Sequence, residues 1–506
     1  MNKKQLFLNI TANILAFAVS TGINFFLTPY IINSVGIDAY GFLPLASNFT
    51  SYITVITSAF NSMSGRFITV KMHENKEEEA KQYFSTTFFV NLSLAVFSAM
   101  VFLFIVIFLE NFINIPSNIL EDVKLLFAFT FMATVIGLIT AVYGVATFCQ
   151  NRLDYKSMVS IGGTVLRATI LIFAFVIFKP KLFYIGLATV VVIIYEGVVN
   201  YKISNKLLPQ LKVDFRYFQK SLIRVLLSSG IWNSFNLLSS VLMTGLDLLI
   251  TNMFIGAEEA GILGIIKVVP GLIYTIVSLM ITSFAPQFVQ DFAHNDMKGL
   301  VKNMDFSAKL VGFISVIPLA GFVAYGKEFY QLWVPTQNAE LLVTLSVLSM
   351  ISCLVSYPIS AFDNTFTAAN KLKWPAIAVF ICGMLNVIIV FLLLKFTNLG
   401  IFAIAATSSV LIMLKDLFFK IPYVAKCVNT NPIHFWKFII RYIMAFVCII
   451  VLSFTVKEVV VINTWGVLIV DATITVAFAL LFNYLILLDK EEKAWVINRI
   501  RKVFNK

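Results

Sequence analysis

The sequence predicts an all-α integral membrane protein with 14 transmembrane helices, built as two six-helix bundles related as a repeat plus two C-terminal helices. Hydrophobic residues make up 59% of the 506 residues and charged residues 13%, and the mean hydropathy is +0.90. A soluble domain is about half apolar and a quarter charged. The apolar residues also gather into stretches long enough to cross a bilayer as helices, joined by short loops.

Each long run of mostly uncharged residues is read as one span. The first seven spans are placed at 5–33, 42–66, 83–109, 123–148, 157–178, 182–200 and 225–255. The other seven are placed at 263–288, 303–325, 339–368, 375–395, 399–420, 437–456 and 464–488. Lys3 and Lys4 before the first apolar run are typical of a signal peptide, but the run is too long and lacks a convincing small-residue cleavage site. We therefore expect an uncleaved first span.

Basic residues fall almost entirely on alternate connections between the spans. One such loop carries Lys202, Lys206, Lys212, Arg216, Lys220 and Arg224. The opposite connections carry Lys179, Lys181, Lys327, Lys395 and Lys457. Because cytoplasmic loops retain Lys and Arg, and because the number of spans is even, we expect both termini to be cytoplasmic.

The net charge of +12 fits this orientation and attraction to anionic membrane lipids. Nucleic acid is not an expected partner, because the basic residues are scattered over short loops instead of gathered with aromatic residues on one soluble module. The five cysteines and three histidines lack the spacing of metal ligands, so neither a metal nor a cofactor is expected. The segment 489–506 has apolar residues at helical spacing among basic ones, which predicts a cytoplasmic amphipathic tail.

The two halves of the chain repeat with an offset of about 220 residues. INSVGIDAYGFLPLA (32–46) aligns with NMFIGAEEAGILGII (252–266), and NRLDY (151–155) aligns with NKLKW (370–374). The aligned pairs include Gly36 with Gly256, Gly41 with Gly261, and Glu196 with Asp416. We read the glycines as residues of tight turns between helices.

This repeat predicts how the chain is divided. An N-terminal six-helix bundle with a connecting loop covers 1–222, and a C-terminal six-helix bundle covers 223–430. Helices 13 and 14 follow at 431–488. Two bundles related along the membrane normal can enclose a cavity that opens to either side in turn.

Four segments resemble a known family. They are GINFFLTPYIINSVGIDAYG (22–41), SMSGRF (62–67), the Gln-Asn-Arg and Asp-Tyr turn at 150–155, and DLLITNMFIGAEEAG (247–261). They resemble the polysaccharide-transport branch of the multidrug/oligosaccharidyl-lipid/polysaccharide (MOP) exporter superfamily. The resemblance implies the twelve-plus-two helix arrangement, the bacterial cytoplasmic membrane, and a flippase for an undecaprenyl-pyrophosphate-linked oligosaccharide such as an O-antigen or capsule repeat unit.

Few ionisable side chains lie inside the predicted spans, where each costs roughly 2.5 to 3.5 kcal/mol to insert. Arg167 lies about 15 Å into the fifth span, close to mid-bilayer, and its repeat counterpart is the uncharged Asn386. The Arg guanidinium suits phosphate oxygens, so Arg167 is the leading candidate to bind a pyrophosphate. The other cavity candidates are Arg66, Lys267 and Asp247. A buried ion pair, or a side chain reaching the inner headgroups, is the structural alternative.

Two carboxylates at matching positions of the repeat predict ion coupling. Glu196 and Asp416 lie in the inner parts of the sixth and twelfth spans, and intramembrane carboxylates often bind a proton or sodium ion. A structural role near the inner interface is the alternative. Lys415 points about 100° away from Asp416 on an α-helix, so the two side chains need not pair.

Two other functions compete with the flippase. A multidrug or small-molecule exporter of the same superfamily is disfavoured by the two extra spans and by the deep Arg167. A membrane-embedded glycan polymerase or ligase needs catalytic groups on a sizeable aqueous face, whereas the outer loops are short and poor in carboxylates. The chain has no Walker A pattern, so ATP hydrolysis is not expected.

Overall fold

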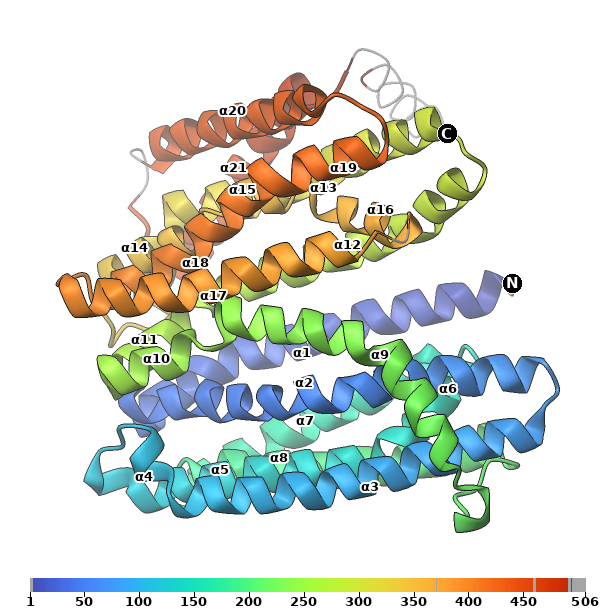
Figure 1. The fold of residues 1–506 in the computed structure, drawn as a ribbon. Coiled ribbons are helices and arrows are strands. Elements are labelled where there is room, and N and C mark those ends of the chain that lie inside the picture. Colours follow the sequence, from blue (N-terminus) through green and yellow to red (C-terminus); the bar gives the residue numbers. More distant parts are fainter. Residues whose placement is uncertain (1–2, 370, 458–460, 490–492, 494–506) are drawn as a thin grey trace. The chain divides into compact units, whose positions relative to one another are not determined.

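The structure is a computed structural model that describes all residues except 1–2, 370, 458–460, 490–492 and 494–506. Helices dominate the described residues, among which there is no strand (Figure 1). Most of the amphipathic tail predicted at 489–506 lies outside the described residues.

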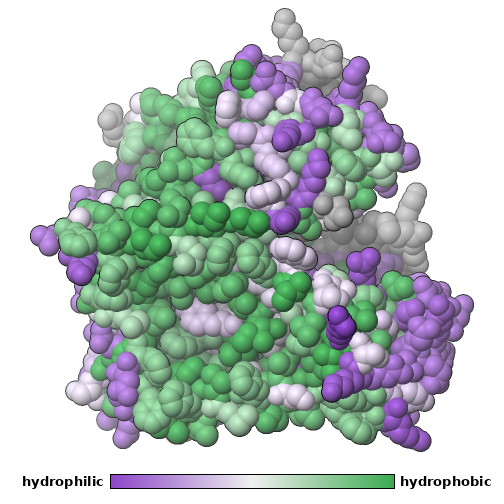
Figure 2. Space-filling model, in the orientation of Figure 1, coloured by the Kyte–Doolittle hydropathy of each residue, from purple (hydrophilic) through white to green (hydrophobic). Residues whose placement is uncertain are grey.

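The helices have the surface of a membrane protein. In the described part of the chain, twelve helical stretches are long and apolar enough to cross a bilayer. Large apolar side chains such as Phe26 and Val176, both 74% exposed, remain on the surface, where an extensive apolar area indicates contact with a membrane. On the face drawn in Figure 2, hydrophobic residues cover the middle of the helices and hydrophilic residues gather at their ends. The predicted all-α membrane fold is confirmed.

The chain divides into two compact units, residues 1–264 and 265–506. The domain boundaries predicted from the repeat stay a prediction, because this division follows contacts and not the repeat. The helices of the first unit are α1 (Lys3–Val35), α2 (Ile37–His73), α3 (Glu77–Ile107), α4 (Leu109–Phe112), α5 (Leu120–Thr140), α6 (Val145–Cys149), α7 (Leu153–Ile177), α8 (Phe183–Leu207), α9 (Lys220–Ser240), α10 (Asp247–Phe254) and the larger part of α11 (Ala257–Ile266).

The described residues of the second unit also form helices and no strands. Its core includes the fully buried rings of Phe288, Phe362 and Phe435. Its helices are α12 (Val268–Ala293), α13 (Met297–Trp333), α14 (Ala339–Met350), α15 (Cys353–Ser356), α16 (Asp363–Ala368), α17 (Lys373–Phe396), α18 (Ile401–Lys415), α19 (Ile421–Cys427), α20 (Pro432–Lys457) and α21 (Trp465–Ile486).

Asparagine ends four helices with the same backbone conformation. Asn75, Asn151, Asn295 and Asn429 have φ between 50° and 56°, a left-handed region that Asn tolerates better than most residues. All four lie on connections predicted to be cytoplasmic. Asn75 and Asn295 also share the spacing of the sequence repeat, so the two positions keep one turn geometry in both halves.

Helix α2 packs closely against α9 because small residues let the two backbones approach. A Cβ atom added to Gly230 of α9 would lie 1.9 Å from the carbonyl oxygen of Ala59 on α2. One turn further along α9, the hydroxyls of Ser58 and Ser234 are 2.7 Å apart. Membrane helices commonly associate through such small residues, since lipid offers little hydrophobic drive for their contact.

The glycines that the repeat aligns have two different structural roles. Gly36 has φ +89° and forms the turn between α1 and α2, as predicted. Gly41 lies inside α2 and faces Gly261 of α11, where an added Cβ would be 2.6 Å from the Gly261 nitrogen. Reading Gly41 and Gly261 as turn residues was therefore wrong, because what requires glycine there is the close approach of two helices.

Two predicted spans are not among the twelve. The span predicted at 42–66 is one long helix, α2, with many polar residues along it. The span predicted at 339–368 was wrong as a continuous helix, because α14 ends at Met350 and only short helical segments follow. Pro358 within that stretch has no N–H group for a helical hydrogen bond.

A side chain of a neighbouring helix satisfies the backbone at this break. The Ser409 hydroxyl on α18 accepts a hydrogen bond from the Ser352 nitrogen at 2.9 Å and donates one to the Ser349 carbonyl at 3.0 Å. Backbone groups buried away from water need such partners. The sequence alone did not reveal the break because the partner comes from a helix about 60 residues further along the chain.

Candidate functional site

Arg167, the leading candidate, lies in the middle of a membrane helix. It is 14 residues from the start of α7 and 10 from its end, or about 21 Å and 15 Å along the axis. Its side chain is half-buried, and its Nε atom is fully buried without a hydrogen-bond partner. The buried hydroxyl of Tyr40 on α2 acts electrostatically on the guanidinium.

No carboxylate among the described residues forms an ion pair with Arg167. A structural ion pair was the alternative explanation for this residue, and the described part of the chain offers no partner for one. A buried guanidinium with unused donors is costly. The arrangement is therefore suited to receive acceptor oxygens from a bound group.

The other two cationic candidates lie elsewhere in the chain. Arg66 lies in the last third of α2 and is exposed, without an ion-pair partner among the described residues. Lys267 directly precedes α12 and belongs to the second unit. The structure therefore does not gather Arg66 and Arg167 into one cluster through direct contacts of the described residues.

Asp247, the acidic cavity candidate, follows a π-helical turn at Val241–Gly245. The wider turn frees the Gly245 carbonyl, which accepts hydrogen bonds from Asn48 and Tyr52 of α2, both at 3.0 Å. Asp247 is buried, and its charge acts on the Tyr52 hydroxyl. π-helical turns of this kind often occur at functional sites, and here one precedes an acidic side chain whose charge acts on Tyr52 of α2.

Glu196, the first ion-coupling candidate, has few polar neighbours. Its half-buried carboxyl lies against Gly163 of α7, where an added Cβ would be 2.9 Å from Glu196 Oε1. No described residue forms a hydrogen bond or ion pair with this carboxyl. A glycine on α7 therefore provides the space in which the carboxyl lies.

Asp416, the second candidate, is held by several polar groups. It begins a second π-helical turn, Asp416–Lys420, and is buried. Its Oδ1 atom lies 2.7 Å from Lys415 Nζ, and its Oδ2 atom accepts a hydrogen bond from Ser356 at 2.6 Å. The expectation that Lys415 need not pair with Asp416 was wrong, because the lysine stem is long and flexible enough to bring its ammonium back to the neighbouring carboxylate.

A second cation adds to this polar group of the second unit. Lys420 is buried and forms an ion pair with Asp363 at 2.8 Å, and it also acts electrostatically on Asp416. The two repeat-related carboxylates thus differ. Glu196 has no ion-pair partner among the described residues, whereas Asp416 belongs to a network with Lys415 and Lys420.

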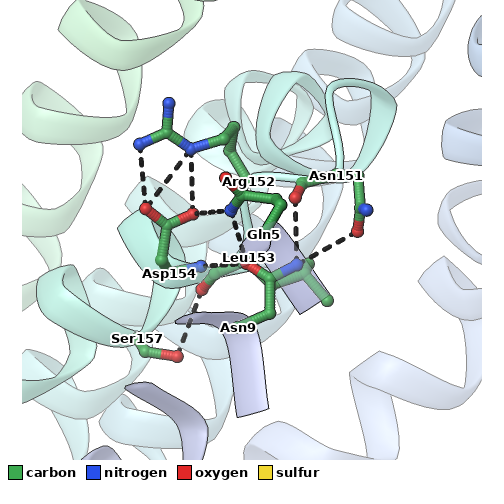
Figure 3. A network of polar contacts seen from close by, with 7 residues as sticks. All are labelled: Gln5, Asn9, Asn151, Arg152, Leu153, Asp154 and Ser157. Carbon is green, nitrogen blue, oxygen red and sulfur yellow. Dashed lines mark hydrogen bonds and ion pairs between the residues drawn. The ribbon is translucent and has the colours of Figure 1, made fainter. Parts of the chain in front are cut away.

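A polar network fixes the first residues of α1 to the start of α7 (Figure 3). Gln5 donates to Asp154 Oδ1 at 2.9 Å, and the buried Asn9 amide donates to the Asn151 carbonyl at 3.0 Å. The Asn9 side-chain oxygen accepts from the Asp154 nitrogen at 3.1 Å. Arg152 donates hydrogen bonds to the Asp154 carboxylate from two nitrogens, Nε and Nη2.

This network was not predicted, although the turn at 150–155 was singled out by resemblance. Asp154 raises the pKa of Arg152 above its ordinary value through their hydrogen bond, so the pair remains ionised. Asn151 takes the left-handed conformation that ends α6 and aims its carbonyl at Asn9. The asparagine in the turn could have indicated the bend, but the partners on α1 lie about 145 residues earlier in the chain.

The described residues contain no group of three His, Cys, Asp or Glu side chains that could hold a metal ion. The cysteines at 149, 353, 382, 427 and 448 are all free thiols.

Comparison with known proteins places the chain in a family. The model of the family described as polysaccharide biosynthesis protein matches residues 6–292. The chain belongs to this family, and the resemblance seen in the sequence is confirmed. The uncharacterized membrane protein EpsK of Bacillus subtilis (strain 168) is 26% identical over 496 residues, which cover 98% of both chains.

Solved structures show the same fold. The lipid II flippase MurJ, in an inward closed conformation, has a TM-score of 0.70 at 14% identity over 95% of this chain and 98% of its own. An inward-facing multidrug resistance MATE family transporter of the MOP superfamily has a TM-score of 0.70 at 10% identity, over 84% and 99%. The fold is therefore that of MOP superfamily transporters, and the chain is a multi-pass membrane protein.

Proposed function

We propose that this protein is a flippase that moves a polyprenyl-pyrophosphate-linked oligosaccharide repeat unit across the bacterial cytoplasmic membrane by alternating access. Membership of the polysaccharide biosynthesis family supports the glycan part of the substrate. The fold shared with a lipid II flippase over 95% of this chain supports the transport of a lipid-linked molecule. In this proposal the protein moves its substrate without changing it chemically. Both termini are proposed to be cytoplasmic.

Arg167 is the single observation that carries the proposal. A pyrophosphate headgroup must bring its negative charge through a medium of low dielectric constant, where an unpaired anion is strongly disfavoured. A guanidinium at mid-bilayer without an ion-pair partner among the described residues offers a fixed fork of donors for phosphate oxygens. We place the pyrophosphate at Arg167, next to the Tyr40 hydroxyl. Arg66 and Lys267 are the further cationic candidates along its path, and Asp247 is the acidic one.

Proton or sodium coupling is the second part of the proposal. Glu196 is the favoured coupling residue, since its half-buried carboxyl has no described ion-pair partner that would hold it ionised. Asp416 is the weaker candidate because Lys415 and Ser356 already hold its two oxygens. A carboxyl that exchanges its cation during transport must be able to exist without a permanent partner.

A multidrug exporter is the competing function. A multidrug transporter has the same TM-score as the lipid II flippase, although it covers 84% of this chain and not 95%. A glycan polymerase or ligase has no comparable support. The two leading functions differ in the charge of the substrate, and an unpaired arginine favours an anion.

The decisive experiment replaces Arg167 in cells whose surface glycan depends on this protein. Arg167→Ala should abolish export of the glycan while the protein still accumulates in the membrane, and Arg167→Lys should restore it only in part, because a point charge replaces a two-pronged donor. Asn386→Ala, at the repeat counterpart, is the matched control and should export nearly as well as the parent.

Surface glycan and membrane-inserted protein are measured side by side. Parental export by Arg167→Ala would remove the main support for an anion-binding role. Loss of export that merely follows loss of protein would make Arg167 a structural residue. Drug resistance that depends on the protein, without any effect on glycan, would favour the exporter.

A further inference from the structure

Helix α2 exposes hydroxyl side chains where a lipid-facing helix would expose apolar ones. Between positions 41 and 65, its exposed residues are one apolar residue, Ile56, and four hydroxyl residues, Ser47, Ser51, Thr54 and Ser62. The hydroxyl residues follow one another at intervals of three, four or eight positions, which puts them on one face of the helix. Polar side chains at membrane depth are costly against lipid, so this face meets water or a polar ligand.

The neighbouring helix α9 has a polar face of the same kind. Asn236 and Ser240 are exposed and Asn233 is half-buried, and their spacing of three and four positions puts them on one side of the helix. The exposed apolar side chains of Ile231 and Leu238 lie about 180° around α9 from them, at 100° per residue. The polar residues of α9 thus form a face of their own.

The two polar faces lie on the same side of the helix pair. Helices α2 and α9 are antiparallel neighbours within the first unit (Figure 1), and they touch where Ala59 meets Gly230. From these contact residues, both polar faces are reached by turning in the same rotational sense, which in an antiparallel pair leads to the same side. The pairs Ser58–Ser234 and Asn48–Gly245 set the register, so Thr54 is level with residues 236–240.

The centre of this shared face lies near mid-membrane. Thr54 is 17 residues from the start of α2 and 19 from its end, and Asn236 is 16 and 18 residues from the ends of the span Lys220–Phe254. The Asn236 amide has no hydrogen-bond partner among the described residues. The Thr54 hydroxyl donates to the Thr50 carbonyl at 3.0 Å, so its oxygen can still accept a hydrogen bond.

We propose that this α2–α9 polar face, which comprises Ser51, Thr54, Ser62, Asn236 and Ser240, binds the sugar part of the lipid-linked substrate. The inference rests on the proposed flippase function and assigns a second subsite, separate from the pyrophosphate at Arg167 of α7.

The chemistry of the face matches a carbohydrate. Amides both donate and accept hydrogen bonds, and the hydroxyls of Ser51 and Thr54 accept because they donate to their own helix. Sugar hydroxyls likewise donate and accept. The five residues of the face carry no charge, so they offer neither a cation to an anionic ligand nor a carboxylate to a cationic drug.

Binding of two lipids to the purified full-length protein tests the proposal. The probes are undecaprenyl pyrophosphate and the lipid-linked oligosaccharide extracted from cells that lack this protein, and native mass spectrometry compares their affinities. Thr54→Val and Asn236→Leu preserve side-chain size. Each should weaken binding of the lipid-linked oligosaccharide by about fivefold, through the loss of one hydrogen bond, and leave binding of undecaprenyl pyrophosphate unchanged.

Thr473→Val on α21 is the matched control. This threonine is also exposed on a membrane helix and donates to its own backbone, at 2.7 Å from the Ile469 carbonyl. The variant should bind both lipids like the parent. If Asn236→Leu does not accumulate in the membrane, Thr54→Val decides alone.

Three results would overturn the sugar subsite. They are unchanged affinity of both variants for the lipid-linked oligosaccharide, an equal loss for both lipids, and ethidium binding that the same variants weaken, which would assign the face to a drug. Arg167→Ala separates the two proposals, since it should weaken binding of both lipids, each of which carries a pyrophosphate. A parent that binds neither lipid would reject the flippase together with its sugar subsite, whereas a parent that binds both equally would reject the sugar subsite alone.

Discussion

Replacing Gly230 by alanine tests the close packing of α9 on α2. The added Cβ would lie 1.9 Å from the carbonyl oxygen of Ala59 and 2.7 Å from its carbonyl carbon, whereas a carbon and an oxygen normally approach to about 3.3 Å. Helices α2 and α9 would have to bend or to separate by roughly 1 Å or more, because the obstacle is backbone and not a flexible side chain. Overpacking of this kind typically costs about 1–3 kcal/mol, which exceeds the gain of about 1 kcal/mol from replacing glycine in a helix.

Gly22→Ala is the matched control for this substitution. Gly22 also lies inside a membrane helix, but no heavy atom lies within 4 Å of an added Cβ, so the control should be neutral or slightly stabilising. Thermal unfolding of both purified variants in the same detergent measures the difference. We expect Gly230→Ala to unfold several degrees below the parent, and a Gly230→Ala protein as stable as Gly22→Ala would refute the reasoning.

Three further predictions follow from the topology, the carboxylates and the polar network. A cysteine at Glu258 should react with an impermeant thiol reagent from outside intact cells that lack the native cysteines, and reaction at Gln210 instead would reverse the orientation. Glu196→Gln should remove the dependence of transport on the proton or sodium gradient, and equal gradient dependence in the parent and Glu196→Gln would exclude coupling there. Asp416→Asn should instead mainly destabilise the protein, by about 3 kcal/mol, because it leaves Lys415 without its ion-pair partner; the unfolding temperature measures this loss. Asp154→Asn should destabilise the protein by about 2 kcal/mol, because charged hydrogen bonds are lost. It should also increase protease cleavage near the N-terminus, and unchanged cleavage would show that the network does not hold α1.

Much of the fold could be predicted because it depends on properties that are local in sequence. A membrane helix needs only a run of apolar residues of sufficient length, and nearly every predicted span coincides with a helix. Gly36 was predicted as a turn residue and has the positive φ that such a turn needs. The family could also be predicted, since the resemblance depends on short continuous segments, and the match of residues 6–292 to the polysaccharide biosynthesis family confirms it.

The break in the span predicted at 339–368 depended on a residue far away in sequence. Ser409 supplies the donor and the acceptor that the interrupted backbone needs. The hydropathy of the sequence does not reveal such a distant partner. Similarly, the sequence pattern predicted that Gly41 and Gly261 are turn residues, whereas their contact shows that two helices cross there at close range.

The sequence by itself determined which side chains are charged inside the membrane, and only the tertiary structure decided which of those charges are balanced. Glu196 and Asp416 are equivalent in the repeat, yet Lys415 and Ser356 hold Asp416 while Glu196 has no described ion-pair partner. Asp471 of α21 (Trp465–Ile486) differs from both, since it is 1% exposed and its charge acts on the Tyr325 hydroxyl of α13. The physical reason is that the cost of a buried charge depends on partners within a few ångströms, and only the packing of helices distant in sequence brings such partners together.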